Sequence, residues 1–167
     1  MGRERLRSST EKHSLSVPLH RYISAAPGQD RAEEMTTLTL EQAEAWIKKA
    51  CAKASQLGVK VSVWVADASG NPVAMARMDG AGILTPDIAR AKAFTAIAYK
   101  SHSKDIAERM KDRPAAALGL TQASGNRTVF LPGGVLAKKG EEIIGAVGVS
   151  GASSDQDHEC GIEAISS

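Results

Sequence analysis

Hydrophobic and polar residues follow a helical period soon after the first 34 residues. In the stretch TLEQAEAWIKKACAKASQLG, apolar residues recur at spacings of three and four across 40–57. Thr39 and Gln42 stand at the spacing of a capping box, and Gly58 follows the last apolar position. The pattern therefore predicts an amphipathic helix over 40–57.

The next stretch, VKVSVWVADASGNPVAMARMDG, predicts a β-hairpin. Its first half alternates β-branched residues with other residues, so that one face carries Val59, Val61, Val63 and Val65. The segment 68–72 contains glycine, asparagine and proline, which favour a turn. We expect two antiparallel strands joined at this turn.

Two further helices are predicted in the middle of the chain. Thr85 can cap a helix that has Pro86 at its first position and runs to about Lys100. The stretch SKDIAERMKD then predicts a short helix that ends before Arg113 and Pro114.

The last third of the chain predicts the rest of the sheet and a closing helix. The strand-like runs, which glycine-containing turns separate, cover 127–131, 135–138 and 142–149. Ser153 and Gln156 repeat the capping-box spacing, so that a helix is expected over 154–165.

The resulting order is helix, two strands, two helices, three strands and helix, which predicts an α+β domain with one antiparallel sheet faced by helices. Residues 1–34 show no sustained period. We interpret them as an N-terminal arm that is poorly ordered or stabilises an oligomer, and we place the domain at 35–167.

The glycines of the stretch GAVGVSGASSDQD raise the question of a phosphate-binding loop. Gly145, Gly148 and Gly151 are spaced by threes inside a predicted strand, and the chain ends before a second strand could follow. This arrangement excludes a dinucleotide-binding βαβ unit. We expect Gly145 and Gly148 to allow close packing, and Gly151 to precede a helix N-terminus whose N–H groups could receive an anion.

Composition narrows the class of protein. The chain has 167 residues, of which 43% are hydrophobic and 24% charged, and this suits one domain with a core. A net charge of +2 and 4% aromatic residues argue against nucleic-acid binding. No apolar run reaches the ~18 residues of a membrane helix. The two cysteines match neither a disulfide framework nor a zinc site, which favours a reducing, cytoplasmic location.

Polar residues at predicted strand ends and turns are candidates for a small-molecule site. We expect Arg77 or Lys92 to bind a carboxylate. The backbone expected around it comes from Gly133, Gly134, Ser150 and Gly151. Acid or base chemistry would fall to Asp79 or Asp157, with burial raising one pKa. The alternative is that these charges form ion pairs or tie loops. Catalytic-triad, HExxH and Walker patterns are not present in the sequence.

Four segments, taken together, resemble one family. They are VWVADASGNPVAMARMDGA, DIARAKAFTA, FLPGG and IIGAVGVSGASSDQDHE, and the resemblance spans about 36–165. It is to the GlcG/HbpS family of haem-degrading or haem-binding domains, which is related to the C-terminal part of PduO-type proteins. The resemblance implies a profilin-like fold with a five-stranded antiparallel sheet flanked by helices. It also implies homo-oligomers of up to eight chains and binding of haem or a cobalamin-type tetrapyrrole.

Haem binding needs an axial ligand such as histidine. Some haem-binding relatives resemble one another in placing a histidine on or near the first helix, and this first helix has none. His102 and His158 remain as candidate ligands, with Thr95 and Tyr99 as weaker ones. Cys51 lies on the apolar stripe of the first helix and is interpreted as a core thiol.

Two hypotheses follow. In the first, the chain is a non-catalytic oligomer that holds a tetrapyrrole or a small carboxylate. In the second, it is a small metal-independent enzyme or accessory subunit that acts on a carboxylated or carbonyl intermediate. We expect self-association through exposed Trp46 and the alanine-rich faces of helices 40–57 and 86–100.

Overall fold

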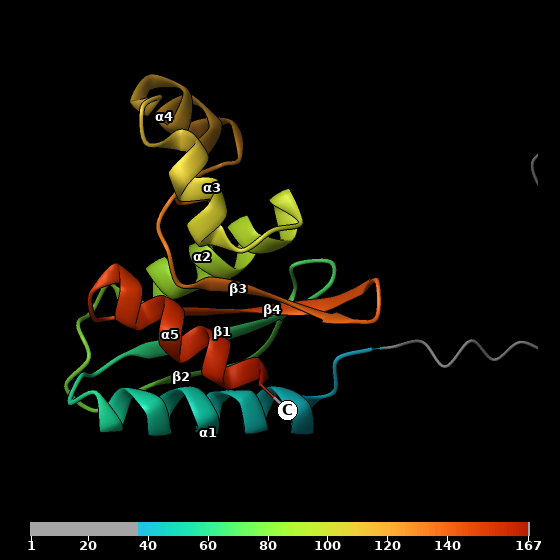
Figure 1. The fold of residues 1–167 in the computed structure, drawn as a ribbon, viewed down its shortest axis with the longest axis vertical. Helices are drawn as coiled ribbons and strands as arrows, with labels where there is room; N and C mark the ends of the chain where they lie inside the picture. Colours follow the sequence, from blue (N-terminus) through green and yellow to red (C-terminus); the bar gives the residue numbers. More distant parts are fainter. Residues whose placement is uncertain (1–36, 167) are drawn as a thin grey trace, which may run out of the picture. The chain divides into compact units, whose positions relative to one another are not determined.

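The computed structural model describes residues 37–166 (Figure 1). The arm predicted over 1–34 lies outside the described residues. The elements, in chain order, are α1 (Leu40–Gln56), β1 (Ser62–Asp67), β2 (Pro72–Arg77), α2 (Thr85–Tyr99), α3 (Ser103–Met110), α4 (Pro114–Ala123), β3 (Gly134–Lys139), β4 (Glu142–Ser150) and α5 (Ser154–Ile165).

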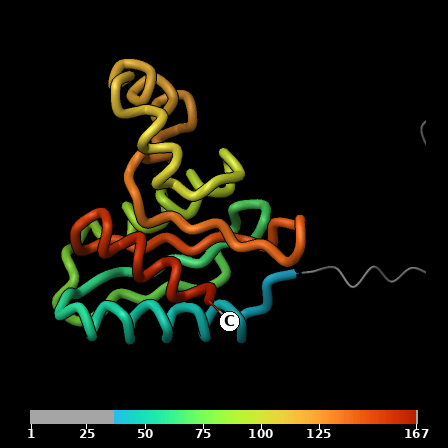
Figure 2. Tube along the Cα trace, viewed as in Figure 1, coloured from blue at the N-terminus to red at the C-terminus, as the bar shows by residue number. Residues whose placement is uncertain are grey.

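A four-stranded antiparallel sheet in the order β2-β1-β4-β3 forms the centre of the described chain. Of the four valines predicted to share one face, Val61, Val63 and Val65 are fully buried against α1 and α5, and Val59 is partly buried against the same core. Helix α2 covers the opposite face, where Trp64 packs with its alanines. The Cα trace shows α5 running beside α1 (Figure 2). The α+β class is therefore confirmed.

Local hydrogen bonding explains where α1 and α5 begin. The Thr39 hydroxyl accepts the N–H of Gln42 at 3.2 Å, and the Gln42 side chain accepts the N–H of Thr39 at 3.0 Å. Ser153 and Gln156 form the same reciprocal pair at α5. Both predicted capping boxes are confirmed, since the residues that make them lie within one turn of each other.

The fifth strand predicted over 127–131 does not form. The backbone N–H of Val129 instead donates to the Thr95 hydroxyl of α2 at 2.9 Å. A helix side chain therefore takes the hydrogen bond that a neighbouring strand would have taken. The sheet has four strands rather than five.

One other local prediction is wrong, and one helix was not predicted. Thr85 does not cap α2; its hydroxyl lies 2.7 Å from both the Ser62 hydroxyl and the Gly82 carbonyl, and Leu84 is the N-cap. Helix α4, which the sequence pattern did not predict, begins at Pro114 and has no buried residue. Helices α3 and α4 extend away from the sheet (Figure 1).

The glycines of β4 allow close packing, as predicted. A Cβ at Gly148 would overlap the carbonyl oxygen of Ala89 in α2 and lie 2.8 Å from the Ala93 nitrogen. A Cβ at Gly145, on the other face, would lie 3.1 Å from Leu38. Helix α2 thus lies on the sheet at a distance that a side chain at 148 would not permit.

The alanine faces named for self-association are buried within the chain itself. Ala43, Ala50 and Ala54 of α1 and Ala89 and Ala96 of α2 are fully buried. Helix packing against the sheet has already used this apolar area.

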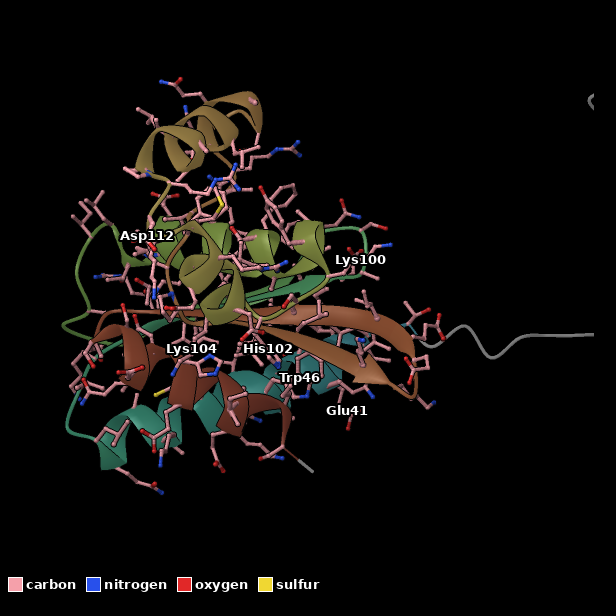
Figure 3. All side chains as sticks on the ribbon, turned by 45° about the horizontal axis from the view of Figure 1, so that its top comes forward. Glu41, Trp46, Lys100, His102, Lys104 and Asp112 are labelled. Carbon is pink, nitrogen blue, oxygen red and sulfur yellow. The ribbon has the colours of Figure 1, made fainter. Side chains whose placement is uncertain are left out.

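Trp46, which was expected to be exposed, is partly covered, whereas several other large apolar side chains are exposed. Trp46, labelled in Figure 3, is half-buried and packs on the core. The exposed large apolar side chains include Ile83, Leu84, Leu118 and Leu120. Among the described residues, every helix is too short or too polar to cross a membrane.

Candidate functional site

Lys92 and Asp157 form a buried ion pair. Lys92 lies in the middle of α2, and its Nζ is 2.7 Å from Oδ2 of Asp157 in the first turn of α5. Nζ also donates to the carbonyl of Val149 in β4 at 2.9 Å. Both charged side chains are 3% exposed. The pair therefore joins the two helix layers at one end of the sheet.

Asp157 also fixes the loop before its own helix. Its Oδ1 accepts the backbone N–H of Ala152 at 3.0 Å. Burial raises the pKa of the Asp157 carboxyl and lowers the pKa of the Lys92 ammonium, and in each case the partner's charge opposes the shift. A negative group of the chain itself thus sits at the N-terminal end of α5, where an external anion was expected near Gly151.

Two glycines at the start of β3, Gly133 and Gly134, lie close to Lys92. A Cβ at Gly133 would lie 3.0 Å from the Lys92 Nζ and 3.0 Å from the Asp157 Cβ. A Cβ at Gly134 would lie 2.6 Å from the carbonyl carbon of Lys92. Gly133 has a φ of +116°, a conformation that side chains rarely adopt. Gly133 therefore lies against the ion pair itself, and Gly134 against the backbone of Lys92.

Arg77 and Asp79 lie elsewhere along the same end of the sheet. Arg77 pairs with Ser62 in β1, which in turn pairs with Ser150 in β4, so the Arg77 backbone is two strands, or about 10 Å, from β4. Its Nη1 donates to the carbonyl of Ala81 at 2.6 Å. Asp79 is exposed in the turn that follows β2.

The structure thus brings together part of the predicted site. The residues gathered around the ion pair are Lys92, Gly133, Gly134, Gly151 and Asp157, whereas Ser150 pairs with Ser62 of β1. The Lys92 ammonium is already bound to a carboxylate, so that an external carboxylate would have to displace Asp157. The ligand-binding and catalytic roles of these residues stay predictions.

The two candidate histidines lie side by side. His102 is the N-cap of α3, and its Nδ1 accepts the backbone N–H of Leu136 in β3 at 3.1 Å. Its ring meets that of His158 edge to face, with centroids 5.9 Å apart. Burial, and then the charge of Lys104, lowers the pKa of His158. Within the described residues, the buried Nδ1 of His158 has no hydrogen-bond partner.

His102 also lines a cavity of about 530 Å³ between the α2–α3 turn, β3 and α5, which we call the His102 cavity. Two lysines, Lys100 and Lys138, and one carboxylate, Asp105, contribute charges to its lining. The Ser101 hydroxyl donates to Asp105 at 3.1 Å. The apolar part of the wall comes from Leu136, Ile162 and Ile165. Figure 3 shows Lys100 and His102 on the elements that frame this region.

Sequence reasoning identified His102 but missed the two lysines. Lys100 takes a left-handed conformation, with a φ of 53°, at the C-cap of α2. Lys138 is near the end of β3. Exposed lysines at helix and strand ends are common, so that neither residue gave a signal before the fold placed both beside His102.

The donor set of the His102 cavity does not provide a preformed iron ligand. Because Nδ1 of His102 accepts a hydrogen bond, Nε2 carries the proton in the neutral ring, whereas a metal-bound histidine normally donates from its other nitrogen. Among the described residues that line this cavity, only His102 is of a type that usually serves as an axial ligand.

The cysteines are not ready metal ligands either. Burial raises the pKa of Cys51, and that of Cys160 to about 11, which keeps both as thiols. Across 37–166, no three His, Cys, Asp or Glu residues form a metal-binding group.

Residues 38–166 match the family model described as haem degrading protein HbpS-like. A 15.0 kDa protein of Citrobacter freundii, uncharacterized and encoded between dhaT and dhaS, is 34% identical over 129 residues, which cover 77% of this chain and 89% of that protein.

Two solved structures are similar in fold and sequence. A complex of PduOC with haem has a TM-score of 0.71 and 31% identity, covering 77% of this chain and 93% of the other. A double mutant of HbpS from Streptomyces reticuli has a TM-score of 0.69 and 34% identity, covering 85% and 96%.

Proposed function

The chain belongs to the family of HbpS-like haem-degrading proteins, and from this premise we propose that it is a non-catalytic ligand-binding protein. Its ligand is an amphipathic carboxylate of the tetrapyrrole class, bound in the His102 cavity. Haem is the member of this class found in the PduOC complex. The two free cysteines suit a reducing, cytoplasmic compartment, which we include in the proposal.

The chemistry of the His102 cavity carries the proposal. A haem-type tetrapyrrole combines an apolar macrocycle with two propionates. Leu136, Ile162 and Ile165 offer an apolar surface to the first, while Lys100 and Lys138 offer positive charge to the second. The cavity, of about 530 Å³, is smaller than a whole tetrapyrrole, so in this proposal it holds one edge of the macrocycle with its propionates and leaves the rest outside.

The hydrogen bonds of His102 determine how such a ligand is held. Its Nε2–H has no partner within the described residues and can donate to a carboxylate. The same proton blocks a bond from Nε2 to iron. Carboxylate and apolar contacts therefore hold the ligand in this proposal, without an axial bond.

Metal-free protoporphyrin IX and hemin test the proposal together. We expect both to bind with similar affinity, measured from the shift of the Soret band during titration. A much tighter complex with hemin would show an axial bond and contradict this binding mode. Cyanocobalamin, which carries amides in place of most carboxylates, is expected to bind more weakly.

Substitutions of residues that line the His102 cavity test where the ligand binds. Lys100→Ala with Lys138→Ala should weaken protoporphyrin binding about tenfold or more, because two charge-assisted contacts are lost. His102→Ala should have a smaller effect. Lys48→Ala, which removes an exposed lysine of α1, is the matched control. Unchanged affinity in the double variant, or no spectral change at micromolar ligand, would overturn the proposal.

We also propose that the protein forms homo-oligomers, of up to eight chains, through α4. This helix carries no charged residue and has no residue buried by its own chain. Leu118 is 61% and Leu120 is 42% exposed. A helix of this composition gains free energy by burying its apolar side chains against a second copy.

A further inference from the structure

A separate cavity on the α2 face of the sheet has the chemistry of an anion site, and we propose that it binds a small aromatic carboxylate. The cavity has a volume of about 300 Å³ and lies between the β1–β2 hairpin, α2 and the loop that follows α4. We call it the Arg127 pocket. Its walls include Trp64, Arg90, Phe94 and Arg127. It shares no lining residue with the His102 cavity.

The charges of the Arg127 pocket favour an anion. Its lining contains two arginines and no acidic residue. Arg90 makes no ion pair or hydrogen bond within the described residues. Arg127 donates from Nε to the Ser124 carbonyl at 2.9 Å, which leaves its terminal nitrogens for other acceptors. Two cations at one apolar pocket without a counter-charge attract a negative group.

A contact with an aromatic ring positions one of these cations. The guanidinium carbon of Arg127 lies 4.5 Å from the centre of the Phe94 ring. Phe94 is itself packed against the hairpin, since a Cβ at Gly70 would lie 3.2 Å from its ring. The planar guanidinium, positioned over the ring, carries its outer N–H groups as a fork that matches the two oxygens of a carboxylate.

The lining and the volume of the Arg127 pocket determine which apolar group the ligand carries. Trp64, Ala66 and Pro72 line the rest of the pocket and favour a flat apolar group. At ~30 Å³ for each water-sized group, about 300 Å³ admits on the order of ten such groups. That is the size of benzoate and far below that of a tetrapyrrole. The ligand class is therefore a one-ring aromatic monocarboxylate.

The two tryptophans of the chain provide the assay. Trp64 lines the pocket, whereas Trp46 packs on the core with α1 on the other face of the sheet. The full-length W46F variant therefore reports from Trp64 alone. Titration with benzoate should change its fluorescence with a saturable curve. Benzyl alcohol, which lacks the charge, and acetate, which lacks the ring, should bind at least about tenfold more weakly.

Arginine variants in the same background test the contacts. Arg90→Ala and Arg127→Ala should each weaken benzoate binding about tenfold or more, and Arg127→Lys should lose part of the affinity because the planar fork is gone. Arg113→Ala, an exposed arginine outside the pocket, should bind as the parent does. Melting curves of each variant check that it is folded.

Three results would overturn the inference: no saturable change with millimolar benzoate, equal binding of benzyl alcohol, or unchanged affinity in both arginine-to-alanine variants. The inference stands apart from the proposed tetrapyrrole site. Removal of Lys100 and Lys138 should leave benzoate binding intact, and removal of Arg90 should leave protoporphyrin binding intact. The failure of one proposal is thus distinguishable from the failure of the other.

Discussion

Replacement of Asp157 by asparagine should strongly destabilise the fold. The amide keeps the shape of the side chain but removes the negative charge 2.7 Å from the Lys92 Nζ. Lys92, which is 3% exposed, would then be a buried cation whose remaining partners are neutral, such as the Val149 carbonyl. Loss of one member of a buried pair costs about 3–5 kcal/mol, and we expect a loss in this range.

A double-mutant cycle separates the ion pair from other effects. Lys92→Met and Asp157→Leu should each be strongly destabilising, while the double variant should cost less than their sum, by about 2 kcal/mol or more. The double variant still loses the acceptor for the Ala152 N–H, which costs roughly 1–3 kcal/mol. The measurement is urea unfolding, with free energies from the midpoint and slope.

An exposed pair on the same helix supplies the control. Asp155 of α5 lies 3.1 Å from Lys104, but these side chains are 85% and 50% exposed. Asp155→Asn should therefore change the free energy of unfolding by less than about 1 kcal/mol. If Asp157→Asn is no more destabilising than this control, the argument from burial is wrong. A folded, fully stable Asp157→Asn that loses turnover of a carboxylated substrate would support the enzyme hypothesis instead.

The pH dependence adds an independent check. Burial already lowers the pKa of Lys92, and the charge of Asp157 opposes this shift. Without that charge the pKa falls further, so the unfolded state of Asp157→Asn binds more protons than the folded state. Its stability should rise with pH as the solution approaches the ordinary lysine pKa of 10.5. A loss of stability over this pH range would contradict the conclusion that Lys92 is a buried cation with a lowered pKa.

Three other changes have expected outcomes. Gly148→Ala should cost about 3 kcal/mol or more in urea unfolding, because its Cβ would overlap the Ala89 carbonyl, whereas Gly119→Ala, which meets no atom within 4 Å, should not destabilise. Although burial raises the pKa of Asp67, hydrogen bonds, chiefly from Asn71, give a net lowering. Wild type should therefore lose hairpin stability as pH falls through this lowered pKa, and Asp67→Asn should lack that acid-dependent loss. Leu118→Lys should reduce the oligomer mass in light scattering, while an unchanged mass would exclude α4 as the interface.

Structural elements that depend on residues close together in the chain could be predicted from the sequence. The capping boxes at Thr39 and Ser153 use partners three residues away, and the β1–β2 turn depends on its own glycine, asparagine and proline. The buried face of β1 follows from alternation along one strand. These features are confirmed because the residues that cause them lie close together in the chain.

Elements with long-range partners were not predictable in this way. The segment 127–131 has the composition of a strand, yet its Val129 N–H bonds to Thr95, 34 residues earlier. Helix α4 lacks the alternation of buried and exposed faces that marked α1. A local pattern carries no information about which distant group takes a backbone hydrogen bond.

The candidate sites divide in the same way. Sequence reasoning singled out Lys92 and Asp157 one by one, and only the fold shows them paired across 65 positions. The two arginines of the Arg127 pocket are 37 positions apart in the chain: Arg90 lies in α2 and Arg127 in an irregular loop. The sequence by itself determined the class of fold and most helix and strand positions, because neighbours in the chain set them. Tertiary structure decided which charges neutralise each other and which stay available to a ligand, because burial and distance between remote segments control the electrostatic energy.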